Sequence, residues 1–98
     1  MAGLLFIVLL SACGGKSDPL SGPAEAVRLY KANCISCHGT ELQGKMGDAT
    51  NLQKIGKQKT KEEIINRINT GKGAMPAFES SLTKEEIEQL ADWLSGKK

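Results

Sequence analysis

Two cysteines and a histidine stand together in the segment Cys34-Ile35-Ser36-Cys37-His38. Cysteines three positions apart fall on one turn of helix, so both sulfurs can reach the same planar group. A histidine directly after the second cysteine can turn its imidazole toward a metal at the centre of that group. The pattern C-x-x-C-H therefore predicts a covalently attached c-type haem, with thioether bonds at Cys34 and Cys37 and with His38 as the proximal iron ligand.

Three other kinds of site use cysteines at this spacing. A thioredoxin-like redox motif needs a βαβ context, and the sequence pattern does not alternate strand with helix. A zinc site would have to combine Cys13, Cys34, Cys37 and His38, and the adjacency of the last two is awkward for one tetrahedral ion. A disulfide between Cys34 and Cys37 would close a small, strained loop and would leave His38 without a role. Haem attachment is the preferred interpretation, with these three as alternatives.

The sixth iron ligand is expected to be a methionine, because His38 is the only histidine in the chain. Met75 lies in the glycine-rich stretch 71–76, where two glycines give the backbone freedom and Pro76 restricts it beside the sulfur. Met46 follows His38 by only eight residues and would have to round the edge of the haem quickly. We expect Met75 as the ligand, with Met46 or an open position as the alternatives.

Length and composition indicate a small domain that needs help to fold. The chain has 98 residues, which predicts one domain, and a formal net charge of +2, which does not predict nucleic-acid binding. Aromatic residues make up only 4%, so little apolar material is available for an independent core. A covalently held haem would supply the extra stabilisation that a domain of this size needs, as a cross-link and as additional apolar core. We therefore expect attachment to be a condition of folding.

The N-terminal region has the features of an export signal and a linker. Residues 2–10 are almost wholly apolar, too few for a membrane span of about 20 residues but suited to a signal-peptide core. The following Leu10-Ser11-Ala12-Cys13 resembles the lipobox of bacterial lipoproteins, in which the cysteine is lipidated and becomes the mature N-terminus. We expect a signal peptide over 1–12, a flexible tether over 13–23 that starts at a lipid-anchored Cys13, and a folded domain over 24–98. An ordinary secretory signal and an uncleaved anchor are the alternatives.

Amphipathic segments predict three helices around the cysteine motif. Residues 24–33 follow Pro23 and carry an apolar face that leads to Cys34. Residues 60–63 and 83–86 are capping boxes, with Thr at the cap and Glu three positions on. The first box opens a helix that should end by Gly71, and the second opens the last helix of the chain. Residues 40–59 predict an irregular loop with a short turn near 52–55, so the fold class is all-α with three to four short helices.

The motifs together resemble class I cytochrome c, and more narrowly the small lipoprotein cytochromes c-551 of Bacillus and relatives. The resemblance rests on the segments 34–39, 71–76 and 93–94, and it covers about residues 10–98. It implies the cytochrome c fold, wrapped around one covalent haem, with the first and last helices crossing. Our candidates for the crossing point are Ala26, Tyr30, Leu90 and Trp93.

The same resemblance implies what the protein does and where. The implied role is a one-electron carrier, not an enzyme, that passes electrons between respiratory complexes, from a quinol-oxidising complex to a terminal oxidase. It would work as a monomer on the outer face of the bacterial cytoplasmic membrane, held to the bilayer through Cys13. A haem-based sensor or small peroxidase is the alternative that an open iron position would allow. A thiol oxidoreductase is a third class, which would need free thiols at Cys34 and Cys37.

One stretch departs from the family. Its members usually have a proline shortly before the position of Leu52, and the carbonyl of that proline commonly accepts the Nδ1 hydrogen of the proximal histidine. Residues 47–52 of this chain contain no proline. The acceptor is expected among the carbonyls of residues 48–50, with the choice left open. This bond would tune the iron through His38.

Overall fold

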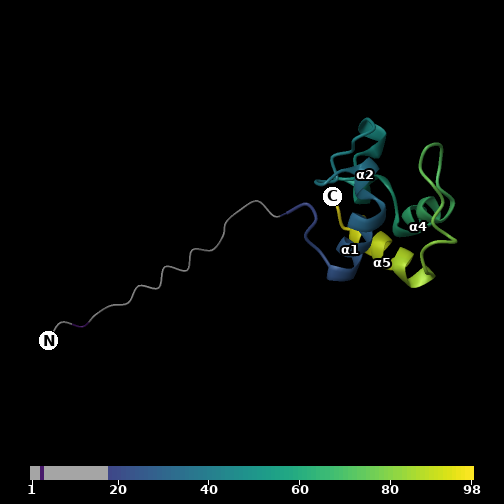
Figure 1. The fold of residues 1–98 in the computed structure, drawn as a ribbon. Helices are drawn as coiled ribbons and strands as arrows, with labels where there is room; N and C mark the ends of the chain where they lie inside the picture. Colours follow the sequence, from purple (N-terminus) through teal and green to yellow (C-terminus); the bar gives the residue numbers. More distant parts are fainter. Residues whose placement is uncertain (1–2, 4–17) are drawn as a thin grey trace.

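The computed structural model describes residue 3 and residues 18–98 of the chain. Residues 18–98 contain helices and loops and no β-strand (Figure 1). The helices are α1 (Ala24–Asn33), α2 (Ile35–His38), the 3-10 helix η1 (Asp48–Thr50), α3 (Ile55–Gln58), α4 (Lys61–Thr70) and α5 (Lys84–Ser95). The predicted all-α class is confirmed, and α1, α4 and α5 are the three helices that the apolar pattern predicted. The short helices α2, η1 and α3 were not predicted as such, because a single turn shows no repeat of the apolar pattern.

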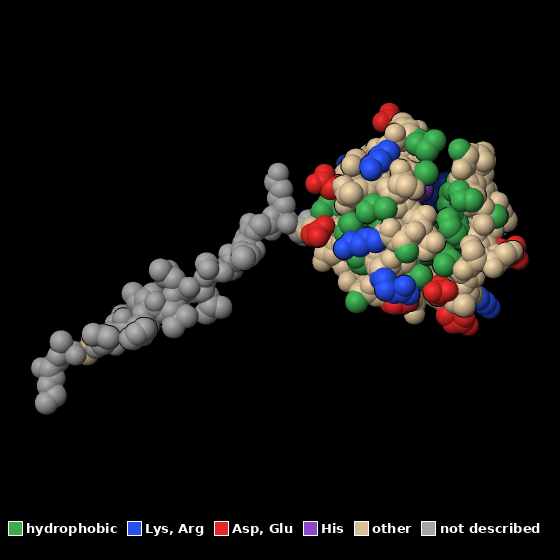
Figure 2. All heavy atoms as spheres, in the orientation of Figure 1, with side chains coloured by type: hydrophobic (Ala, Val, Ile, Leu, Met, Phe, Trp, Pro, Cys, Tyr) green, Lys and Arg blue, Asp and Glu red, His purple; other side chains and the backbone are tan. Residues whose placement is uncertain are grey.

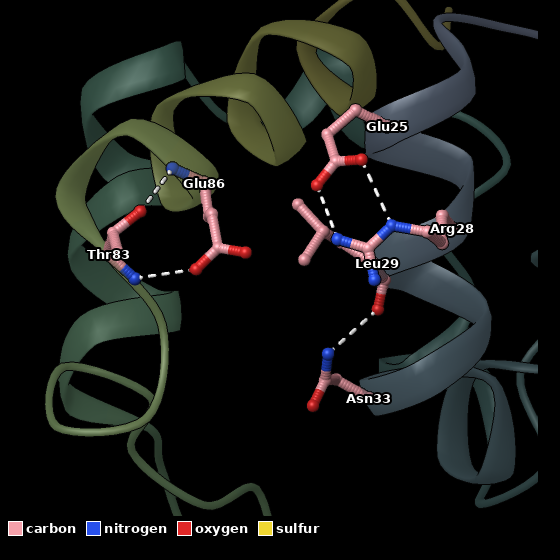
Figure 3. A network of polar contacts seen from close by, with 6 residues as sticks. All are labelled: Glu25, Arg28, Leu29, Asn33, Thr83 and Glu86. Carbon is pink, nitrogen blue, oxygen red and sulfur yellow. Dashed lines mark hydrogen bonds and ion pairs between the residues drawn. The ribbon is translucent and has the colours of Figure 1, made fainter.

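Both predicted capping boxes are present and begin α4 and α5. The Thr83 hydroxyl accepts from the Glu86 backbone N–H at 3.1 Å, and the Glu86 carboxylate accepts from the Thr83 N–H at 2.9 Å (Figure 3). Thr60 and Glu63 make the same pair of bonds at 3.2 and 3.1 Å. Each cap stabilises its helix by about 1 kcal/mol. The boxes therefore fix where both helices start, as the sequence predicted.

Helix α1 is held by its buried face rather than by its polar contacts. Its first turn carries Glu25, which pairs with Arg28 on the exposed side of the helix (Figure 3). Exposed ion pairs of this kind contribute little to stability. Charged side chains of both signs are interspersed over the face drawn in Figure 2, and they form no single basic patch there. The buried residues of α1 are Ala26, Leu29 and Tyr30, and they carry its packing.

The core lies where α1 packs against α5, and α4 packs on α5 as well (Figure 1). All four residues that we expected at the crossing are buried. The rings of Tyr30 and Trp93 meet edge to face, with centroids 5.6 Å apart and an interplanar angle of 75°. Such a pair contributes about 0.5–1.5 kcal/mol beyond the area that it buries. The side chains of Ala26 and Ala91 are almost fully buried and let the two helices approach closely.

The end of the predicted tether packs against this core. Leu20 is buried, and the backbone carbonyl of Ser21 accepts a hydrogen bond of 3.0 Å from the Trp93 indole Nε1–H. A buried indole needs such an acceptor, because an unpaired N–H would carry a desolvation cost. Gly22 lies so close to Trp93 that a Cβ there would be 2.5 Å from the indole Cδ1. Packing of the domain therefore starts near Leu20, a few residues before the boundary at 24 that the composition suggested.

Helix α3 touches the end of the chain through Gly56. Its N–H donates to the Lys97 carbonyl at 2.7 Å, and a Cβ at Gly56 would overlap the Ser95 carbonyl oxygen and lie 2.8 Å from the Lys97 oxygen. Gly56→Ala would gain up to about 1 kcal/mol of helix propensity. Overpacking costs about 1–3 kcal/mol and should exceed that gain. We expect a net loss of about 1 kcal/mol in the free energy of unfolding, measured by denaturant titration of the holoprotein.

Gly96→Ala is the matched control for this prediction. A Cβ at Gly96 would lie 3.4 Å from the nearest atom, the Trp93 carbonyl oxygen, which is an ordinary contact. Its effect should stay within about 0.5 kcal/mol. A Gly56→Ala protein as stable as wild type would show that α3 does not pack closely on the C-terminal segment.

Candidate functional site

The cysteine motif forms one continuous helical turn. Cys34 ends α1 and caps α2, and α2 carries Cys37 and His38. The Cys34 N–H donates to the Tyr30 carbonyl at 2.8 Å, and the His38 N–H donates to the Cys34 carbonyl at 3.0 Å. The side chains of Cys34, Cys37 and His38 are all half-buried. This arrangement places the three groups of the C-x-x-C-H motif on one short, backbone-supported element.

Both thiols of the motif are free. Burial, and to a lesser extent the nearby Cys37, raises the pKa of the Cys34 thiol to about 11. A reactive thiol oxidoreductase needs a thiolate near neutral pH and therefore a lowered pKa. The raised pKa of Cys34 and the absence of a β-strand among residues 18–98 both count against the thiol-enzyme alternative.

The imidazole of His38 is held by a backbone carbonyl. Its Nδ1 lies 2.7 Å from the carbonyl oxygen of Thr50 at the end of η1. Because a carbonyl oxygen can only accept, Nδ1 carries a proton, and in the neutral ring the lone pair is then on Nε2. This tautomer is the one that a metal-binding histidine needs. Of the three carbonyls left open by the sequence, the acceptor is that of Thr50.

Tyr30 ties the end of the motif to α1. Its hydroxyl donates to the carbonyl of Gly39 at 2.6 Å, and the side chain is fully buried. Burial raises the pKa of Tyr30 well above its ordinary value, so the hydroxyl stays protonated as a donor. Gly39 has a φ of 94°, a left-handed conformation that favours glycine where the chain leaves α2. The sequence placed Tyr30 only at the helix crossing, although a buried tyrosine hydroxyl is itself a signal for a nearby acceptor.

Met75 lies in a tight turn after α4. Lys72 and Met75 exchange two backbone hydrogen bonds of 3.1 and 3.0 Å, and Gly71 and Gly73 have φ values of 65° and 58°. A Cβ at Gly71 would lie 2.7 Å from the carbonyl carbon of Pro76, so this turn has no room for a larger residue. The Met75 side chain is half-buried against the core, whereas Met46 is 56% exposed. The structure thus distinguishes the two methionines by their burial.

The surroundings of these groups fit a large apolar cofactor. Figure 2 shows a hollow in the domain where purple histidine atoms and blue Lys or Arg atoms are partly visible, with hydrophobic side chains beside it. The donor groups that the described residues offer are two free thiols, an imidazole whose Nδ1 is held by Thr50, and the half-buried thioether of Met75. Thiols, imidazole and thioether are the groups that a haem c takes from its protein. The residues present therefore fit a haem.

Cys13, the predicted signal peptide over 1–12 apart from Gly3, and residues 13–17 of the predicted tether lie outside the described residues. Within the residues that the structure does describe, no helix is both long enough and apolar enough to cross a bilayer. The predicted lipid anchor therefore stays a prediction.

Comparison with known proteins gives a consistent family. Residues 22–94 match the family model described as cytochrome C oxidase, cbb3-type, subunit III. The chain is 35% identical to cytochrome c-551 of Bacillus subtilis, over all of this chain and 93% of that protein. It is 34% identical to cytochrome c6 of a Nostoc species, over 95% of this chain and 83% of the relative.

Solved structures agree with the sequence relatives. The crystal structure of cytochrome c6C from Synechococcus sp. PCC 7002 superposes with a TM-score of 0.64 at 27% identity, over 72% of this chain and 90% of that one. Cytochrome c6 from the diatom Phaeodactylum tricornutum gives a TM-score of 0.53 at 27% identity, over 72% and 87% of the two chains. The chain therefore belongs to the class I cytochrome c family, electron carriers rather than enzymes, which bind one covalent haem c.

Proposed function

We propose that this chain is a membrane-anchored monohaem cytochrome that carries single electrons from a quinol-oxidising complex to a terminal oxidase. In this proposal Cys34 and Cys37 form the thioethers, His38 is the proximal ligand and Met75 is the distal one. The observation that carries it is the His38 ring, whose Nδ1 proton is held by Thr50 and whose Nε2 is free to donate. The two free thiols on the same turn supply the attachment points.

A carrier follows from this ligand set because both axial positions would be filled by the protein. The bound haem supplies the one-electron couple of its iron. With His38 and Met75 both holding the iron, no iron position would be left for a substrate or a gas. A peroxidase would also need distal polar catalysts, and His38 is the only histidine in the chain. These residues therefore support electron transfer over sensing or peroxide chemistry.

The optical spectrum of the purified holoprotein tests the carrier proposal. We expect a low-spin reduced spectrum, a methionine–iron charge-transfer band in the oxidised state, and little binding of carbon monoxide. A high-spin spectrum with ready carbon monoxide binding would instead indicate the sensor or peroxidase. If protein purified from cells that have haem-maturation machinery contained no haem, the result would favour the thiol oxidoreductase alternative.

The respiratory partners are tested with membranes. Reduced holoprotein mixed with membranes that contain the terminal oxidase should be oxidised, and an inhibitor of that oxidase should stop the reaction. A second assay with quinol and the quinol-oxidising complex should reduce the oxidised protein. Failure of both reactions with a normal spectrum would mean that the electrons pass to other partners.

The N-terminal segments are proposed to place this carrier at the outer face of the cytoplasmic membrane. Residues 1–12 would be removed as a signal peptide, and lipidated Cys13 would hold the domain over 24–98. If the predicted tether starts at Cys13, about seven residues would precede Leu20 and Ser21, which pack against the domain. A flexible chain of that length reaches on the order of 15 Å. The domain would therefore stay close to the bilayer while it turns between partners.

Cys13→Ala is expected to release the domain from the membrane with its haem intact. The reason is that one residue would carry the anchor, while attachment of the haem uses only Cys34 and Cys37. Membrane fractionation and mass spectrometry of the native N-terminus measure this. Ser17→Ala, a change in the same tether, is the control and should stay in the membrane fraction. An unmodified Cys13 thiol, or an N-terminus upstream of it, would contradict the prediction.

A further inference from the structure

The side chain of Thr50 makes two hydrogen bonds to the loop that precedes it. Its hydroxyl donates to the Gly47 carbonyl at 2.7 Å and accepts from the Met46 backbone N–H at 3.2 Å. The Thr50 N–H also donates to the Gly47 carbonyl at 3.0 Å. One hydroxyl thus closes the segment 46–50 into a compact turn whose last residue is Thr50.

The other end of this turn is joined to the cysteine motif. The Gly44 N–H donates to the His38 carbonyl at 2.7 Å, and the Lys45 N–H donates to the Cys37 carbonyl at 2.9 Å. Gly44 also lies against Thr50, because a Cβ on Gly44 would be 2.6 Å from the Thr50 hydroxyl oxygen. The path from His38 through residues 44–46 to Thr50 returns to the His38 ring through the 2.7 Å contact between Nδ1 and the Thr50 carbonyl. The hydroxyl therefore completes a closed path of hydrogen bonds and backbone that begins and ends at His38. We call this path the ring of bonds around His38.

We propose that the Thr50 hydroxyl is a positioning group that sets the orientation of the His38 ring and, through it, the reduction potential; this rests on the proposed role of His38 as iron ligand. The carbonyl that holds Nδ1 and the side chain that carries the hydroxyl share the Thr50 Cα. Fixing the hydroxyl on Met46 and Gly47 therefore limits how far the carbonyl can move. No proline ring is present in the stretch 47–52 to limit it instead.

The direction of the change in potential follows from how strongly the His38 Nε2 donates electrons to the iron. A well-aligned bond from Nδ1–H to a carbonyl makes Nε2 a stronger electron donor. A stronger donor stabilises ferric iron more than ferrous iron and lowers the potential. Loss of the hydroxyl loosens the carbonyl, weakens the bond and should raise the potential. Removing the direct hydrogen-bond partner of a metal ligand costs roughly 10–100-fold in metal affinity or activity. The Thr50 hydroxyl acts one step further away, so we expect a several-fold effect on the ratio of oxidised to reduced protein.

The test compares Thr50→Val and Thr50→Ser in the haem-loaded full chain. Valine keeps the shape of threonine and removes the hydroxyl, whereas serine keeps the hydroxyl. In Thr50→Val the ratio of oxidised to reduced protein at a fixed ambient potential should fall several-fold, and the His38 Nδ1 proton should exchange faster with solvent by nuclear magnetic resonance. Thr50→Ser should keep both values near those of wild type. Thr50→Ala, which introduces no extra bulk, should behave as Thr50→Val does.

Thr70→Val is the matched control. The Thr70 hydroxyl also donates to a backbone carbonyl, that of Asn66 at 2.8 Å, on the exposed surface of α4. The same hydroxyl also contacts the Gly71 carbonyl at 3.5 Å. Its loss does not touch the ring of bonds around His38, so the exchange rate of the His38 Nδ1 proton should not change. A change in stability alone in Thr50→Val and Thr50→Ala, with the potential and the proton exchange of wild type, would overturn the proposal. So would an equal shift in Thr50→Ser.

The wild-type protein separates this proposal from the proposed function. If its spectrum lacks the signature of histidine ligation, the proposed function fails and this inference fails with it. If the wild-type spectrum is that of a histidine–methionine haem and Thr50→Val leaves both readouts unchanged, only the positioning role of Thr50 is overturned.

Discussion

Replacing Met75 by alanine is expected to leave the haem attached and to lower its reduction potential by a substantial part of the roughly 0.8 V range that axial ligands span. A neutral thioether favours ferrous iron, whereas water or hydroxide in its place favours the ferric state. The thioethers at Cys34 and Cys37 and the ligand His38 do not depend on Met75, so the protein should stay haem-bound. The methionine–iron charge-transfer band should disappear, and carbon monoxide or cyanide should bind more readily.

Met46→Ala is the control for this result. Met46 is 56% exposed and sits on a loop whose backbone is held by Thr50, so its loss should change neither the band nor the potential. Met75 instead is half-buried in a turn that Gly71 and Gly73 shape. If Met46→Ala abolished the band while Met75→Ala kept it, the assignment of the distal ligand would be wrong.

The double variant Cys34→Ala/Cys37→Ala is expected to lose the haem and most of its helical signal. The three longer helices have 10, 10 and 12 residues, and isolated helices below about 12–15 residues are marginal in water. The motif on α2 stands between α1 and the loop 40–50, and both are joined to it by backbone hydrogen bonds. Without the attached haem, the half-buried Leu52, Met75 and Phe78 would lose part of their apolar surroundings. Far-ultraviolet circular dichroism and thermal melting of the purified variant measure the loss.

The Cys13→Ala protein is the control for this variant, since it removes a cysteine without touching the haem attachment. It should keep its haem, its helical signal and its cooperative melting. A double variant at 34 and 37 that melts cooperatively with native helical content would show that the core between α1 and α5 is sufficient by itself. That result would contradict the requirement for haem in folding.

Local chemistry explains which parts of this fold could be predicted. The capping boxes at Thr60 and Thr83 and the end of α4 at Gly71 depend on neighbouring residues only, and the structure confirms each of them. The motif at Cys34 to His38 is equally local, and it was enough to predict the cofactor of the family. These elements carry their own signal because every group involved lies within a few positions in the chain.

The remaining features depend on residues that are distant in the sequence. Three successive carbonyls precede Asn51, and only the folded loop decides that the one of Thr50 reaches His38, 12 positions away. The contact of Trp93 with Ser21 spans 72 positions. Composition assigned Ser21 to a flexible tether, because Gly, Ser and Pro near it give no sign of a buried indole that needs an acceptor.

The contact between Ser21 and Trp93 also decides where a pull on the proposed lipid anchor would enter the domain. The Trp93 indole N–H and the Lys97 ammonium both reach the Ser21 carbonyl, at 3.0 and 3.4 Å, and the Lys97 nitrogen lies 5.1 Å from the centre of the Trp93 ring. A force along the tether would therefore enter at the packed pair of α1 and α5, where it acts as shear between two helices. The turn that carries Cys37 and His38 is joined directly to that pair, because Cys34 ends α1 and the Tyr30 hydroxyl donates to the Gly39 carbonyl. If the proposed lipid anchor exists, motion of the membrane would therefore reach the surroundings of His38 through α1 and Tyr30.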